Sequence, residues 1–304
     1  MPWPGSWKRA LDREAVAGWL LAAPAVALLL AFVAAPFALA LGLSVTDLRL
    51  GSPLPVHWAG LAQYAAILDD PGFRRALLNN AVFAAVVVPA QTLLALALAL
   101  LLDRPLRGMA VLRTLFFLPV VFPMALVAVV WTLLYAPGPD GPVNAALASL
   151  TLGAWTPVDF LHDPDWALPA LMVLSVWQGV GFQMVILLAA LQGVPAHLHE
   201  AARLDGAGPV RRFLHVTLPQ LRNPLIFVAL VTTILAFRLF DQVQIMTRGG
   251  PLDATTTVMY EAVTAVFERQ QVARGAAMTV VFFAVVLAIT VLQRRLVRER
   301  REIE

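Results

Sequence analysis

The sequence lacks cysteine and contains few charged residues. None of the 304 residues is cysteine, which excludes a disulfide framework and a cysteine-ligated metal site. Only 13% of the residues are charged, whereas a soluble domain carries about a quarter. Lys8 is the only lysine, so the Gly-Lys-Ser/Thr sequence of a Walker A loop does not occur. The chain therefore cannot be a P-loop ATPase, and it has too little charge to face water throughout.

Apolar residues make up most of the chain and are gathered in long runs. The hydrophobic fraction is 60% and the mean hydropathy is +0.78. A helix needs about 20 apolar residues to cross the hydrocarbon core of a bilayer. We predict an all-α polytopic membrane protein with six transmembrane helices, at about 17–45, 77–102, 111–135, 166–191, 224–246 and 276–292. The membrane domain is expected to cover 17–293, with its core at 75–293 and with tails at 1–16 and 294–304.

The first apolar run could also be interpreted as a secretory signal peptide, with a cleavage site at 38–40. The run is far longer than the roughly 7–15 residues of a signal core, which favours a transmembrane span. After it, the helical spacing of apolar residues at 61–68 predicts a short interfacial helix. Three prolines inside the later runs are expected to bend the second and third spans: Pro89, Pro119 and Pro123.

Basic residues are unevenly distributed among the predicted loops. The richer set lies in the two tails, in the turn after the second span and in the loop after the fourth: Lys8, Arg9, Arg13, Arg104, Arg107, Arg113, Arg203, Arg211, Arg212, Arg222, Arg294, Arg295, Arg298, Arg300 and Arg301. The positive-inside rule assigns this set to the cytoplasm. Both termini and the loop 195–222 are therefore predicted to be cytoplasmic. Because the arginines flank the spans, the net charge of +3 indicates no nucleic-acid partner.

The loop 195–222 is the longest charged segment between two strongly apolar ones. Pro195 suits the first turn of a helix, Gly206 and Gly208 end that helix, and Pro209 can begin a second one. The expected apolar stripe of the second helix consists of Val210, Phe213, Leu214 and Leu218. We predict a helix–turn–helix with an exposed elbow and with a positive φ at Gly206. The simpler alternative is a loop that is charged only because water surrounds it.

Three short motifs occur in this loop in a fixed order: Glu200-Ala201-Ala202, Asp205-Gly206-Ala207 and Leu218-Pro219. Solvation of a loop explains its charges but not this order. In these motifs the chain resembles the membrane permeases of ATP-binding-cassette (ABC) importers, with Thr217 as a mild departure from the aliphatic residue that is frequent there. The resemblance implies that these eight residues dock a separate ATPase, which binds ATP and Mg²⁺. It also implies that this chain holds no cofactor and is not an enzyme.

The likeness extends over nearly all of 58–293. Its more specific pieces are Phe-Asp-Gln-Val at 240–243, Gly-Gly-Pro at 249–251 and Ala-Thr-Thr-Thr at 254–257, which resemble the carbohydrate-importing permeases of the maltose and glycerol-phosphate group. This resemblance implies the transmembrane fold of type I ABC importers, in the plasma membrane of a bacterium or archaeon. It implies three partners: a second homologous permease in a heterodimer, an ATPase dimer and an extracytoplasmic solute-binding protein. A sugar is the implied cargo, and glycerol 3-phosphate or another polyol is left open, with Arg238 as the phosphate partner.

Polar residues inside a predicted span are candidates for lining a solute path. Near the outer end of the fifth span, Arg238, Asp241 and Gln242 are spaced i, i+3 and i+4, so we expect them on one face of a helix. The alternative is an Arg238–Asp241 ion pair that only neutralises itself at the membrane interface.

The fourth span carries a second set of candidates for the solute path: Trp177, Gln178, Gly179, Phe182 and Gln183. Aromatic rings and amides suit the C–H faces and hydroxyl groups of sugars. The alternative is that Gly179 and Gly181 only let helices approach each other, while Trp177 anchors the interface. The resemblance to the maltose permease supports a role in the solute path for Trp177, Gly179, Phe182, Arg238 and Asp241.

No metal site and no catalytic group are expected. His197 and His199 would diverge on a helix, the other three histidines are far apart in sequence, and no nucleophile–base set is evident. An ATP-independent secondary transporter would also carry polar residues in its spans. The two halves of this chain show no internal repeat, however, and that class would leave the three motifs of the loop unexplained.

Overall fold

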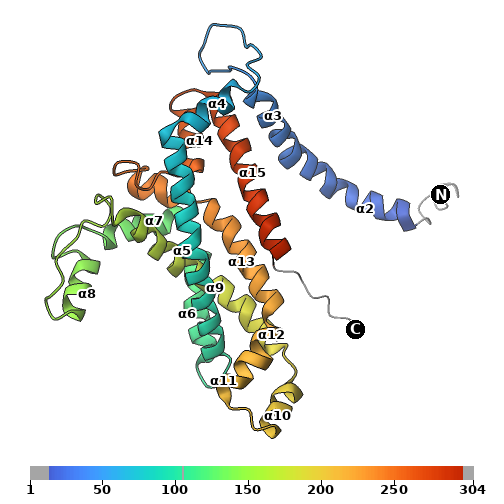
Figure 1. Ribbon diagram of the computed structural model, residues 1–304, viewed down its shortest axis with the longest axis vertical. Helices are drawn as coiled ribbons and strands as arrows, with labels where there is room; N and C mark the ends of the chain where they lie inside the picture. Colours follow the sequence, from blue (N-terminus) through green and yellow to red (C-terminus); the bar gives the residue numbers. More distant parts are fainter. Residues whose placement is uncertain (1–13, 105, 297–304) are drawn as a thin grey trace, which may run out of the picture. The chain divides into compact units, whose positions relative to one another are not determined.

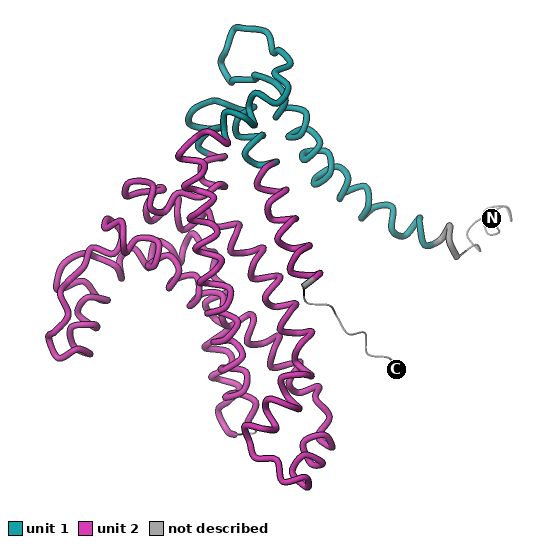
Figure 2. The backbone as a smooth tube through the Cα atoms, viewed as in Figure 1, with its two compact units in different colours: residues 1–67, 264–280 teal, residues 68–263, 281–304 magenta. Residues whose placement is uncertain are grey.

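The computed structural model describes residues 14–104 and 106–296, so most of the predicted tails at 1–16 and 294–304 lies outside the described residues. The described part is helical, and its one β feature is an isolated bridge between Thr46 and Trp58. The chain separates into two compact units (Figure 2). Unit 1 comprises the residues up to 67 together with 264–280, and unit 2 comprises 68–263 together with the residues from 281 onward.

Unit 1 contains the first predicted span. Its helix consists of α2 (Glu14–Leu29), a π-helical turn, η1 (Leu30–Ala34), and α3 (Ala35–Ser44). The part Gly18–Ser44 is long and apolar enough to cross a membrane, in agreement with the prediction for 17–45. The short helix predicted at 61–68 is present as α4 (Ala62–Asp69), and the hydroxyl of its Tyr64 lies 2.6 Å from the hydroxyl of Ser44 at the end of α3.

Two long helices form the centre of unit 2: α5 (Pro71–Leu102) and α9 (Ala167–Gln192), which pack against each other (Figure 1). The start of α5 is capped because the carboxylate of Asp70 accepts a hydrogen bond of 2.8 Å from the Gly72 backbone N–H, with Pro71 in the first turn. Small residues of α5, among them Ala95 and Ala99, are fully buried in a cluster with leucines of α9. In a bilayer, small residues stabilise helix pairs by close packing.

The third predicted span is broken into α6 (Met109–Val121) and α7 (Met124–Leu134), which are bent by 100° relative to each other. The break falls at Phe122 and Pro123, so it includes the second of the two prolines that predicted a disturbance. Phe122 has an extended backbone (φ −81°, ψ 140°), which is the conformation that a following proline favours. Pro89, by contrast, lies inside α5, which continues through it. The next element is α8 (Pro142–Leu150).

The fifth predicted span, 224–246, is present in part as α13 (Arg222–Phe237), which begins and ends earlier than predicted. The preceding part of the loop 195–222 forms α11 (Pro209–Arg212), a π-helical turn, η2 (Phe213–Thr217), and α12 (Leu218–Gln220), and this part is bent by 65° from α13. After α13 come η3 (Val243–Thr247), α14 (Val258–Phe267) and α15 (Val272–Leu296). Among the described residues, four helices are long and apolar enough to cross a membrane, and counting each bent pair as one span gives six, the predicted number.

Helix α13 ends at Phe237 rather than near the predicted residue 246, and two asparagines of α5 bind the segment that follows it. The side-chain N–H of Asn80 donates to the Phe237 carbonyl (3.3 Å), and its oxygen accepts from the Val258 N–H (2.9 Å). Asn79 donates to the carbonyls of Asp253 and Thr256, each at 2.9 Å. Both asparagines are buried, and these bonds attach the segment 238–257, which includes the helical turn η3, to α5.

Candidate functional site

The loop 195–222 forms the predicted helix–turn–helix. Its first helix is α10 (Ala196–Leu204), with Pro195 at the N-cap, and α11 begins at Pro209. Gly206 has a φ of +74°, as predicted, and closes α10 in a Schellman motif. The motif consists of the bonds from Gly206 N–H to Arg203 O (3.0 Å) and from Ala207 N–H to Ala202 O (2.9 Å). Ala202, Gly206 and Ala207 therefore each have a defined place in the turn.

The elbow, which we define as residues 200–210, presents both charged and apolar side chains to the outside. Glu200 and Asp205 are exposed, and within the described ranges neither carboxylate forms an ion pair. Leu204 is 89% exposed and Val210 is 70% exposed. Large apolar side chains that are exposed at the tip of a loop are typical of an interaction surface and not of a loop that only faces water. Within unit 2, α10 and α11 lie at one end of the α5–α9 pair (Figure 1).

The second helix of the loop departs from the expected apolar stripe. Phe213 packs against the buried cluster that contains Leu221, but Val210 and Leu214 are exposed. The reason is the π-helical turn η2, in which the Leu218 N–H donates to the Phe213 carbonyl five residues earlier and so changes the helical register. Pro219 follows in α12, immediately before the 65° bend at Leu221.

A small cavity of about 110 Å³ is lined by residues of α5, α6, α9 and α13, by the first residue of α7 and by the segment that follows α13. Five of the predicted path residues line it: Gln178, Gly179, Phe182, Gln183 and Gln242. The remaining lining residues are Phe83, Val87, Gln91, Val120, Met124, Ser175, Thr232, Leu235 and Ala236. All fourteen are uncharged, and six of them have polar side chains, so the cavity is neutral and mostly apolar with a few polar groups.

Three glutamine side chains hold the helices together around this cavity. Gln242 donates to the Ser175 hydroxyl (2.9 Å), Gln91 donates to the Ser175 carbonyl (3.0 Å), and Gln183 donates to the Thr232 hydroxyl (2.6 Å). The sequence analysis missed Gln91 and Thr232. Gln91 could have been found from the sequence, because it is a polar residue inside a predicted span.

Arg238 and Asp241 do not lie on one helix face, contrary to the prediction. Helix α13 ends at Phe237, and the chain then turns, so that Arg238 and Asp241 are exposed while Gln242 is buried. Neither charged residue lines the cavity. The alternative of a self-neutralising pair is also unsupported, since no ion pair joins these two residues in the part of the chain that the structure describes.

Gly179 and Gly181 allow close packing, which was the alternative to a role in the path. A Cβ at Gly181 would overlap the backbone carbonyl of Phe116 in α6. A Cβ at Gly179 would overlap the side-chain amide of Gln91 in α5. Gly179 is consistent with both interpretations, because it allows close packing of α9 against α5 and also lines the cavity.

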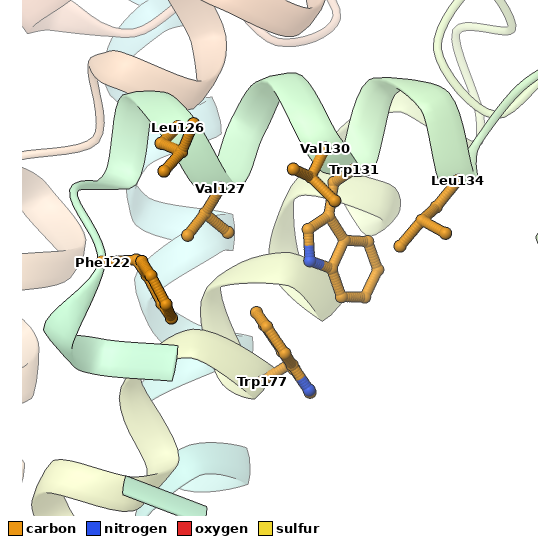
Figure 3. Close-up of a pocket in the computed structure, with 7 residues that line it drawn as sticks. All are labelled: Phe122, Leu126, Val127, Val130, Trp131, Leu134 and Trp177. Carbon is orange, nitrogen blue, oxygen red and sulfur yellow. The ribbon is translucent and has the colours of Figure 1, made fainter. Parts of the chain in front are cut away.

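Trp177 lies apart from the neutral cavity. It lines a separate apolar pocket of about 410 Å³ with residues of α7 and with Phe122, as Figure 3 shows. Its ring centroid is 5.4 Å from that of Trp131. Trp177 is 45% exposed, which fits its interpretation as an interface residue better than a place in the cavity.

Within residues 14–104 and 106–296, no group of three or more His, Asp or Glu side chains could hold a metal ion. His162 is paired instead with Asp159, with its Nδ1 3.0 Å from a carboxylate oxygen. Partial burial raises the pKa of Asp159, but the hydrogen bonds and electrostatic attraction of His162 together outweigh this effect and lower the pKa below its usual value. This exposed pair lies in the loop before α9 and outside the cavity.

Comparison with known proteins agrees with this architecture. Residues 91–302 match the family described as the binding-protein-dependent transport system inner membrane component. The chain is 31% identical to the sulfoquinovosyl glycerol transport system permease protein SmoG of Agrobacterium fabrum, over 97% of this chain and 94% of that protein. It is 32% identical to the lactose transport system permease protein LacF of Rhizobium radiobacter, over 97% and 98%.

A solved structure has the same fold. It is a bacterial ABC transporter involved in the import of the acidic polysaccharide alginate, with a TM-score of 0.80 at 20% identity, over 97% of this chain and 99% of the matched chain. The apolar spans, their two breaks and the family match lead to one conclusion. This chain is an integral membrane protein that belongs to the family of inner membrane components of binding-protein-dependent transport systems.

Proposed function

We propose that this chain is a permease subunit of an ABC importer and forms, with a second permease, the path of a sugar across the plasma membrane. The observation that carries the proposal is the elbow: a closed helix–turn–helix with exposed apolar and acidic side chains, located between α9 and α13. ATP and Mg²⁺ bind to a separate ATPase, and this chain contributes no catalytic group or cofactor. The two termini and the elbow lie in the cytoplasm, where ATP is available.

The elbow has the properties needed to transmit motion from an ATPase. The Schellman motif closes α10 in a defined turn, and only Gly208 separates this turn from the start of α11. Leu204 and Val210 provide apolar contact area, and Glu200 provides a carboxylate for a basic residue of the partner. Asp205, Ala201 and Leu218-Pro219 complete the docking segment, with Pro219 at the start of the bend into α13.

The size of the neutral cavity supports a second permease. Ligand pockets span roughly 300–1,000 Å³, whereas this cavity has about 110 Å³. One chain therefore supplies part of a solute site, and a homologous chain facing it supplies the remainder. Arg238 and Asp241, which are exposed in this chain, reach a solute only in such an assembly, and their place in the path stays a prediction.

A sugar is the proposed cargo because the cavity combines amides, hydroxyls and an aromatic ring. Gln178, Gln183 and Ser175 can exchange hydrogen bonds with sugar hydroxyls, and Phe182 can contact an apolar sugar face. The relatives named for lactose and for sulfoquinovosyl glycerol support the same class. Glycerol 3-phosphate or another polyol is the second candidate, and a secondary transporter is less consistent with the elbow.

Uptake measurements test the proposed function. Cells of the source organism, with and without this gene, are compared for uptake of lactose, maltose, trehalose, glycerol and sn-glycerol 3-phosphate at micromolar concentrations. Deletion should abolish uptake of one solute or of one group of related solutes, and the intact gene should restore it. Unchanged uptake of every solute that the wild-type cells accumulate would contradict the assignment.

A further inference from the structure

Two pockets outside the neutral cavity follow each other along the contact between α5 and α13. The first, of about 390 Å³, includes Leu218 of the loop 195–222, and the second, of about 350 Å³, includes Phe237 at the far end of α13. Gln293 of α15 lines both pockets. The residues of α5 that line them recur every three or four positions from Ala81 to Leu96, so they lie on one face of the helix. The two pockets therefore form one groove, which we call the lateral groove.

The lateral groove has the length and the polarity that suit an acyl chain. From Ala81 to Leu96, α5 rises by about 22 Å, because each residue of a helix adds about 1.5 Å. One leaflet contributes about 15 Å to the hydrocarbon core of a bilayer. All residues that line the groove are uncharged, and only Thr92, Thr233 and Gln293 have polar side chains. One acyl chain can therefore lie along the groove over the depth of a leaflet.

A hydrogen bond between two helices places the end of α15 beside this groove. The side-chain N–H of Gln293 donates to the Thr233 hydroxyl (3.0 Å), which itself donates to the Ala229 carbonyl (2.8 Å). Helix α15 thus ends beside α13, partway along it (Figure 1). Arg294 and Arg295 follow Gln293 directly in the last turn of α15, and both are exposed. Two arginines therefore lie within two residues of a side chain that lines the groove.

A third arginine lies at the end of the groove that is nearer to the elbow. Arg222 begins α13 and is spaced i, i+3 and i+4 from Leu225 and Ile226, which line the groove, so the three share one face of the helix. Arg222 is exposed, and among the described residues no ion pair involves Arg222, Arg294 or Arg295. The groove therefore combines an apolar lining with three neighbouring positive charges that no acidic group of the described chain neutralises.

We propose that the lateral groove binds an anionic phospholipid of the cytoplasmic leaflet. The lipid phosphate pairs with Arg222, Arg294 and Arg295, and one acyl chain lies along α5 and α13. The positive-inside rule assigns all three arginines to the cytoplasmic side. Guanidinium groups form bidentate hydrogen bonds with phosphate, and each basic residue near an anionic membrane surface strengthens binding about fivefold. An apolar helix of another subunit also fits an apolar groove, but it would leave the three arginines without a negative charge.

The absence of native cysteine allows a single fluorescent reporter to be placed in the groove. Ala85 is exposed and lines the groove, so Ala85→Cys carries the fluorophore in the full-length chain, purified with the subunits that accompany it and reconstituted in nanodiscs. Phosphatidylglycerol and phosphatidylcholine, each brominated midway along the acyl chains, are compared as quenchers. Only phosphatidylglycerol has a net negative charge. We expect it to reach half-maximal quenching at an about tenfold lower mole fraction.

The triple variant Arg222→Gln/Arg294→Gln/Arg295→Gln tests the contacts with the phosphate. The preference for phosphatidylglycerol should fall below about twofold, because the charges are lost while the lining of the groove is unchanged. The matched control is Arg104→Gln/Arg107→Gln, which removes two exposed arginines on the same predicted side of the membrane but outside the groove. This control should keep the full preference. Size-exclusion profiles check that each variant is folded.

Three results would overturn the proposal. The first is equal quenching by the two lipids at Ala85→Cys, or a preference that survives in the folded triple variant. The second is the absence of quenching by either lipid, which would show that another subunit covers the groove. The third is the same preference at Val86→Cys, one position further along α5 and outside both pockets, because the lipid would then only collect around the whole protein. The inference goes beyond the proposed function, and none of these results affects gene-dependent uptake, so the two fail separately.

Discussion

Replacing Glu200 with lysine should abolish solute-stimulated ATP hydrolysis by the assembled transporter, while the chain still inserts into the membrane. Glu200 is exposed on α10, and no ion pair holds it within the described part of the chain. Substitution of an exposed residue of this kind changes the free energy of unfolding by no more than about 0.5 kcal/mol. In a docked complex, however, charge reversal brings like charges together at a cost of several kcal/mol.

The measurement compares phosphate release by purified transporter with and without solute and binding protein. Glu268→Lys is a matched control, because Glu268 is also exposed but lies outside the elbow. Gly206→Pro should give the same loss as Glu200→Lys, since proline requires a φ near −65° and Gly206 has +74°. Stimulated hydrolysis at the wild-type rate in both elbow variants would show that the elbow does not couple the two subunits.

Gly181→Ala should sharply lower the amount of folded chain, whereas Gly179→Ala should have a smaller effect that Gln91→Ala relieves. At Gly181 the obstacle is the backbone of Phe116, which cannot move without displacing α6. At Gly179 the obstacle is the end of the Gln91 side chain, which can be removed. Overpacking a buried site typically costs about 1–3 kcal/mol, and a clash with backbone lies at or above the upper end.

Yield and thermal stability in detergent measure this difference. The informative comparison is the double-mutant cycle of each glycine variant with Gln91→Ala: a positive coupling is expected at Gly179 and none at Gly181. If Gly181→Ala is as stable as the wild type, or if Gln91→Ala rescues both glycine variants equally, α9 does not contact α6 and α5 as described. The cycle thereby tests the helix packing on which the cavity depends.

Features that depend on local sequence were predicted well. Long apolar runs indicated the spans. Gly206 and Pro209 indicated the elbow, because glycine ends a helix and proline starts one through contacts with neighbouring residues alone. Pro119 and Pro123 marked the place of the break between α6 and α7. They could not give its 100° angle, which depends on the surroundings of both helices.

Features that depend on distant residues were missed. Helix α13 ends at Phe237, whose carbonyl accepts a hydrogen bond from Asn80, 157 residues earlier in the chain, and no helical pattern in the fifth span reveals this contact. Because the helix ends there, Arg238 and Asp241 do not share the proposed face. Gln91 is recognisable as a polar residue inside a predicted span, but its contact with the Ser175 carbonyl, 84 residues later, is not.

The docking role of the elbow requires that residues 200–210 face the cytoplasm, and this can be measured directly in intact cells. Ala207 in the elbow and Ala148 in α8 are each replaced by cysteine in the otherwise cysteine-free chain. A membrane-impermeant thiol reagent that enters only the extracytoplasmic space is then added. Ala148→Cys should be labelled in intact cells, and Ala207→Cys should be labelled only after permeabilisation. Labelling of Ala207→Cys in intact cells would place the elbow on the side without ATP and contradict its role as the ATPase docking site.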